Sequence, residues 1–225
     1  MTPPKDLPMS IDWSVVEMAI PLLAEGTVMT LKIAAIAGVL GLAGGVALGL
    51  VSLGGWIWAR WLVRGYVDFI RGTPLLIQIF IVFFGLPAMG LRFGEFWAGV
   101  IALSLNCAGY VAEVVRGTVG GVETGQTEAA KSIGMTRGKI LLFVLLPQSI
   151  RPMMPALTND VITLLKNTSL LSVISVYELT RSGQAIIASH FAPVEIFALL
   201  AIYYYAIISV LSWVSRVIER RLPAW

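Results

Sequence analysis

The sequence predicts an all-α membrane protein of about five transmembrane helices with a pair of short cytoplasmic helices, and three observations support this fold class. Of its 225 residues, 57% are hydrophobic and 13% are charged, with a mean hydropathy of +0.85, whereas soluble domains carry about 25% charged residues. Several stretches without a charge approach the roughly 20 residues with which a helix crosses about 30 Å of hydrocarbon. The basic residues are also unevenly distributed among the connections, as membrane topology requires.

The expected spans are residues 27–53, 66–87, 96–116, 155–177 and 195–215. Four of them contain long charge-free stretches, whereas the fourth span carries Asp160 and Lys166. A lipid-facing helix tolerates such residues badly, but a helix that lines a protected route can keep them. We therefore expect an external segment over 1–26, a single transmembrane domain over 27–218 that includes a cytoplasmic loop over 117–150, and a cytoplasmic tail over 219–225.

The basic residues determine the expected orientation, because Lys and Arg near span ends favour the cytoplasm. One set of connections holds Arg60, Arg64, Arg71, Arg116, Lys131, Arg137, Lys139, Arg151, Arg216, Arg220 and Arg221. The other set holds Lys5, Arg92 and Arg181. Five spans place the termini on opposite sides, so we expect the N-terminus outside and the C-terminus inside. The N-terminal segment lacks the basic start and cleavage site of a secretory signal.

Two features of the spans concern packing. Gly41, Gly45 and Gly49 recur every four residues in the first span, so one helix face offers no side chains and another helix can approach closely. This face either packs within the subunit or forms an interface with another subunit. The single cysteine, Cys107, excludes an intrachain disulfide and is expected to be a small packing residue.

The cytoplasmic loop is the only sizeable segment between spans, so a cytoplasmic partner would have to meet it. Good helix formers predict a helix over 123–133 that stops at Gly134. Thr136 is a candidate N-cap for a second helix, which we expect to end ahead of Pro147. The consecutive small side chains of Ala129 and Ala130 would fit a groove on a partner, with charged residues around them. The alternative is an ordinary pair of surface helices.

The order of residues in this loop resembles the EAA signature of permease subunits of ATP-binding-cassette (ABC) importers. The signature is Glu-Ala-Ala, three residues, Gly, nine residues, Ile, one residue and Leu-Pro. It appears here as Glu128-Ala129-Ala130, Gly134, Val144 and Leu146-Pro147, with Val in place of Ile. In that family the segment is the coupling helix that docks on the ATPase. The resemblance therefore implies a coupling role for Glu128, Ala129, Ala130 and Gly134.

Three further stretches resemble the polar amino-acid branch of the same family: Phe69 to Gln78, Ala108 to Gly117 and Leu164 to Leu170. Together the resemblance covers the chain from about Ile33 to Arg216. It implies the five-helix core of type I importers in a bacterial cytoplasmic membrane. It also implies a second permease subunit, the same or related, an external amino-acid-binding protein and ATPase subunits that hold the ATP and Mg. The substrate would be a small polar amino acid.

Gly72, Thr73 and Pro74 interrupt an apolar stretch, so the second span is expected to break or kink there. A break inside a membrane frees backbone polar groups, which are tolerable only where protein or a wet cavity satisfies them. These groups, with Thr73 and Gln78, are candidates to hold the ammonium or carboxylate of an amino acid. The alternative is a packing kink without a ligand.

Asp160, Thr163 and Asn167 are spaced i, i+3 and i+7, so on a helix they share one face, which we expect to point into the protein. In the resembling family, carriers of basic amino acids can place acidic residues in this region. Asp160 fits that role, but Asn167 is an amide, so glutamine-like and other polar amino acids are equally expected. The alternative for Asp160 is a salt bridge with Lys166 or with a neighbouring helix.

The sequence offers no sign of chemistry in this chain alone. Residues 134–140 resemble a phosphate-binding loop but have three rather than four residues between the glycines and no hydroxyl residue after Lys139. No set of catalytic residues, metal ligands or nucleic-acid-binding features is apparent. Two other functions are weighed: an ion-coupled secondary carrier, which Asp160 favours and the small number of spans disfavours, and a non-transporting assembly factor, which would not need polar residues in a span.

Overall fold

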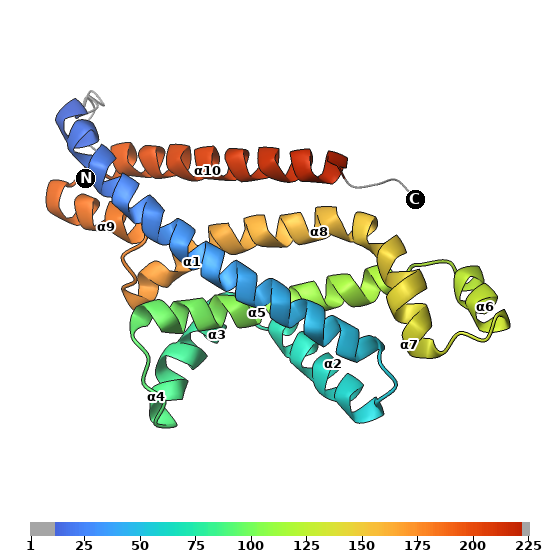
Figure 1. Ribbon diagram of the computed structural model, residues 1–225. Coiled ribbons are helices and arrows are strands. Elements are labelled where there is room, and N and C mark those ends of the chain that lie inside the picture. Colours follow the sequence, from blue (N-terminus) through green and yellow to red (C-terminus); the bar gives the residue numbers. More distant parts are fainter. Residues whose placement is uncertain (1–11, 222–225) are drawn as a thin grey trace, which may run out of the picture.

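The computed structural model describes residues 12–221, and within them all regular structure is helical (Figure 1). The α-helices are α1 (Trp13–Leu53), α2 (Ile57–Gly72), α3 (Leu75–Phe80), α4 (Leu86–Ala88), α5 (Glu95–Gly120), α6 (Thr124–Ser132), α7 (Arg137–Ile140), α8 (Leu146–Asn167), α9 (Leu179–His190) and α10 (Pro193–Arg221). In this part of the chain four helical stretches are long and apolar enough to cross a membrane, and the bent pair formed by α2 with α3 and α4 gives a fifth. The predicted fold class is thereby confirmed.

Helix α1 begins at Trp13, not near residue 27, so the part of the expected external segment over residues 13–26 is helical. The Asp12 side chain caps this helix by accepting bonds from the backbone N–H groups of Ser14 and Val15, at 3.0 and 3.4 Å. The extension packs Ala19 and Leu23 against α9 and α10. Residues 1–11 lie outside the described residues. At the other terminus α10 continues through Arg221, and the rest of the expected tail lies outside the described residues.

The prediction that the second loop helix ends ahead of Pro147 is wrong. Helix α7 continues through a π-helical turn over Leu141–Leu145 into α8, whose second residue is Pro147. A proline removes one helical hydrogen bond and crowds the carbonyl four residues before it. The wider π-helical turn immediately before Pro147 gives that carbonyl room, so the helix passes through the proline. The expected fourth span, 155–177, is accordingly α8 followed by a 3₁₀ segment over Thr168–Ile174.

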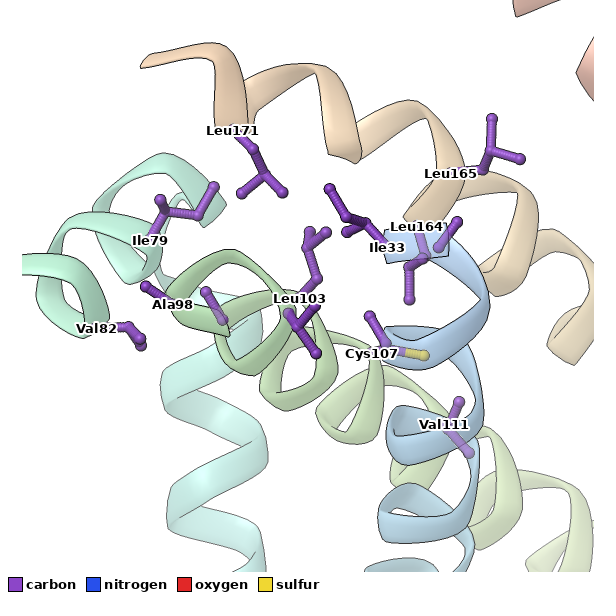
Figure 2. Packing of buried hydrophobic residues seen from close by; sticks show 14 of the residues in the cluster. Ile33, Ile79, Val82, Ala98, Leu103, Cys107, Val111, Leu164, Leu165 and Leu171 are labelled. Atoms are coloured by element: carbon purple, nitrogen blue, oxygen red, sulfur yellow. The ribbon is translucent and has the colours of Figure 1, made fainter. Parts of the chain in front are cut away.

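Helices α1 and α5 cross in direct contact, and the glycine stripe makes this possible (Figure 1). A Cβ atom on Gly41 would lie 2.6 Å from Cys107 Cβ, and one on Gly45 would lie 2.5 Å from Val111 Cβ. A Cβ atom on Gly49 would meet Val115 at 2.6 Å. The stripe therefore packs within the subunit. Figure 2 shows the core beside this crossing, where Ile33, Leu103 and Leu164 lie between the helices.

The long helices give the molecule two ends (Figure 1). Helix α1 begins beside α9 at one end, whereas α10 ends toward the other, where α6 and α7 extend beyond α1 and α5. Because the described chain makes an odd number of crossings, the start of α1 and the end of α10 lie toward opposite ends of the molecule. Helix α10 lies along the edge of the molecule, against α8 and α9.

Candidate translocation cavity and coupling surface

The second span is broken at Thr73 and Pro74, as the sequence predicted. Helix α2 and the α3–α4 segment meet at an angle of 112°, and both residues of the junction have extended backbone. Proline cannot donate a hydrogen bond and disfavours helix in the residue before it, so α2 ends at Gly72 with unpaired carbonyl groups.

Gln78 satisfies those carbonyl groups. Its side-chain nitrogen donates to Ile70 O at 2.8 Å and to Thr73 O at 3.1 Å, and lies 3.0 Å from the Thr73 hydroxyl. Its side-chain oxygen accepts a bond from the Asn106 amide at 2.9 Å. Gln78 is only 5% exposed and is not among the residues that line the cavity described below, so its place on the substrate route stays a prediction. Gln78 instead holds the bend in place.

A cavity of about 370 Å³ lies between the bend, α5 and α8, within the usual size range of small-molecule sites. It is lined by Thr73, Leu75, Asn106, Cys107, Tyr110, Asn159, Asp160, Thr163, Leu164 and Asn167. The three α8 residues expected to share a face do so, because all three line this cavity, and Thr73 joins them from the break. The structure thus brings together four of the five predicted pathway residues.

Asp160 supplies the only ionisable carboxylate of the cavity lining and no basic residue opposes it. Its Oδ2 atom is buried and has no hydrogen-bond partner within the described residues. A salt bridge with Lys166 is not formed, and the two salt bridges of residues 12–221 both involve Glu113. Buried polar atoms are nearly always paired, so this oxygen is available to a ligand.

Sequence reasoning missed Asn106, Tyr110 and Asn159 as lining residues. Asn106 was detectable, because it is an amide in the middle of an otherwise apolar span. Tyr110 and Asn159 gave no comparable signal, since each becomes part of the site only through the packing of α5 against α8.

The predicted coupling residues gather on and after α6, at the end of the molecule where α10 ends (Figure 1). Gly134 has a φ of +80°, which glycine adopts without strain, and the Met135 N–H donates to Ala130 O at 3.1 Å. Glycine therefore ends α6 as predicted. Thr136 occupies the N-cap position of α7 but makes no capping bond with its side chain.

The two alanines of the coupling signature differ in exposure. Ala129 is exposed beside Glu128, whereas Ala130 is 5% exposed and faces the protein. Ala129 is therefore the alanine that the fold leaves open to a partner, and the coupling role of both alanines stays a prediction. Ile133 is 78% exposed at the end of α6.

A bundle of membrane-crossing helices with a polar cavity and a helix pair projecting from one end defines a membrane permease subunit. The chain belongs to the family of inner-membrane components of binding-protein-dependent transport systems, as its match over residues 41–223 shows.

Individual relatives agree with this family. The chain is 42% identical to the glutamine transport system permease protein GlnP of Escherichia coli K12, over 95% of this chain and 99% of that protein. It is 35% identical to the arginine transport system permease protein ArtQ of Bacillus subtilis, over 96% and 99%. The solved structure of an amino acid ABC transporter with histidines is 34% identical and superposes with a TM-score of 0.88 over 95% of this chain and all of that one.

The methionine ABC transporter MetNI is 21% identical, with a TM-score of 0.76 over 91% of this chain and 98% of that one, and so shares the fold. The predicted membership of the ABC importer permeases is therefore confirmed. The alternatives of an ion-coupled secondary carrier and a non-transporting assembly factor are set aside.

Proposed function

We propose that this permease subunit conducts a neutral polar amino acid of the glutamine type across the bacterial cytoplasmic membrane, driven by ATP that a separate subunit hydrolyses. The identities to GlnP and ArtQ support an amino acid. The amides of Asn106, Asn159 and Asn167 support a substrate with a polar uncharged side chain, because amides pair with amides as both donors and acceptors.

The observation that carries this proposal is the buried, unpartnered Oδ2 of Asp160. Every amino acid has an α-ammonium group, and a carboxylate in a poorly hydrated cavity attracts it strongly. Acidic amino acids would place a second negative charge beside Asp160 with no basic lining residue to offset it. We therefore expect acidic substrates last, and the amides of the lining are the reason to place neutral polar substrates ahead of basic ones.

Membership of this family supports the remaining partners. We place α6 in the cytoplasm, against an ATPase subunit that holds the ATP and Mg, with the start of α1 outside, where a binding protein delivers the substrate. A second permease subunit, the same or related, completes the route. The many arginines near the α6 end support this orientation.

The test compares Asp160→Asn with Lys166→Gln in the complex purified from its native membrane and reconstituted into vesicles. Both variants remove one charge from α8, but Lys166 is exposed and does not line the cavity. We expect Asp160→Asn to lower uptake of glutamine at least tenfold and Lys166→Gln to leave it within about twofold. Unchanged rates and unchanged selectivity among glutamine, arginine and glutamate in Asp160→Asn would refute the role of Asp160.

A further inference from the structure

A second cavity, of about 330 Å³, lies away from the translocation cavity, between the C-terminal end of α1, helix α2 and the C-terminal half of α5. Its lining includes four arginines: Arg60, Arg64, Arg71 and Arg116. The only acidic residues of its lining are Asp68 and Glu113. Positive charge therefore exceeds negative charge at this place, although it belongs to a membrane-crossing domain.

The ion pairs leave two of these arginines available. Glu113 accepts two bonds from Arg116, at 2.6 and 2.8 Å, and lies 3.3 Å from Arg71. Within residues 12–221, Arg60 and Arg64 form no salt bridge, and Asp68 forms none either. Because Arg60 and Arg64 lie four residues apart on α2, both guanidinium groups project from one helix face. Such a pair is suited to hold one phosphate group between its planar donors.

The surroundings of this pair are apolar and exposed. Trp61 lies between the two arginines in sequence, and Trp61, Arg60 and Arg64 together line a shallow hollow at the start of α2. Ile57 also lines this hollow and is 55% exposed, and Trp61 is 64% exposed. Tryptophans concentrate where a membrane helix meets the headgroup region. A ligand at this place therefore meets cationic donors and an apolar surface side by side.

We propose that Arg60 and Arg64 bind the headgroup phosphate of an anionic phospholipid, whose apolar portion contacts Trp61 and Ile57 in the same hollow. Basic hollows beside transmembrane helices attract anionic lipids in this way. A free phosphate ion would use the arginines but not the exposed Trp61 and Ile57. The lipid would fix the start of α2 at the membrane surface and so support the bend that follows at Thr73.

Native mass spectrometry tests the proposal. The sample is the complex purified from its own membrane by means of this chain. The complex is exchanged into mixed micelles with equal amounts of phosphatidylglycerol and phosphatidylcholine, and the ratio of the two retained lipids is measured. We compare the unmodified complex with the Arg60→Ala/Arg64→Ala double variant and with Arg92→Ala, an exposed arginine outside this cavity. A further sample of the unmodified complex, in micelles of phosphatidylcholine alone, receives inorganic phosphate.

We expect the unmodified complex and Arg92→Ala to retain phosphatidylglycerol preferentially, and the double variant to lose about an order of magnitude of that preference. Arg60→Lys/Arg64→Lys should keep part of it, because the charge remains but the planar donors are lost. Equal retention of the two lipids by the unmodified complex would overturn the proposal. An undiminished preference in the double variant would also overturn it, as would retention of inorganic phosphate in place of lipid. Loss of a protein partner from the double variant, with lipid retention unchanged, would overturn it as well.

Discussion

Several polar side chains of the cavity come from α8, and Thr73 joins them from the break in the second span. Asp160, Thr163 and Asn167 were predictable, because helix geometry alone places residues at i, i+3 and i+7 on one face. The bonds of Gln78 were not predictable, because its side chain turns back along the chain to the carbonyl groups that the break at Thr73 leaves unpaired. Hydropathy and periodicity do not encode which way a single flexible side chain turns.

Gln78 is expected to be essential for the stability of the bend. In Gln78→Leu the carbonyl groups of Ile70 and Thr73 and the amide of Asn106 lose their partner, and each buried unpaired group costs about 1–3 kcal/mol. We expect a clear fall in the melting temperature of the purified protein in detergent. Gln184→Leu is the matched control, because Gln184 makes only one long bond, of 3.5 Å to Ser172. Equal melting temperatures for the two variants would contradict this role.

The helices themselves were largely predictable, since their apolar stretches are long, but two of their ends were not. Helix α1 is extended to Trp13 by its contacts with α9 and α10, which are distant in sequence. The helix through Pro147 depends on a π-helical turn that no sequence rule signalled. Tertiary packing and local backbone adjustment, rather than propensity, determine both ends.

The crossing of α1 and α5 predicts opposite responses at two glycines of one helix. Gly45→Ala would place a Cβ atom 2.5 Å from Val111 Cβ and 2.8 Å from the Ala108 carbonyl oxygen, whereas Gly38→Ala meets nothing within 4 Å. Overpacking costs typically about 1–3 kcal/mol, while alanine in a helix with free space is favoured by about 0.5–1 kcal/mol. Thermal denaturation should therefore show a lower midpoint for Gly45→Ala and an equal or higher one for Gly38→Ala. The reverse order would mean that α1 and α5 do not cross here.

Helix α6 makes a separate prediction about the partner. The exposed side chain of Ala129 is small, so Ala129→Trp should prevent a close fit of α6 in a groove of the ATPase without disturbing the packing of the buried Ala130. We expect at least tenfold less ATPase subunit to co-purify, since the bulky side chain holds the two surfaces apart. Ala88→Trp, at an exposed alanine of α4 far from α6 (Figure 1), should leave recovery unchanged. Full recovery with Ala129→Trp would place the ATPase contact elsewhere.

At the scale of the whole molecule, the proposed function makes this permease subunit a route with one docking end, at α6. Hydropathy predicted the crossings and the spacing of residues 128–147 predicted the family. The 112° bend and the cavity beside it required the structure, because they arise from the packing of α3, α5 and α8. On the proposed function, movement of substrate through this cavity depends on work transmitted through α6.

Uptake by reconstituted vesicles tests this dependence most directly. Vesicles containing the native complex receive ATP on the side of α6, and glutamine with the external binding protein on the other side. Parallel vesicles contain this chain alone under a proton or sodium gradient. We expect accumulation only with the complex and ATP, and none with the chain alone under either gradient. Gradient-driven accumulation of glutamine by the chain alone, without ATP, would contradict an ATP-driven permease.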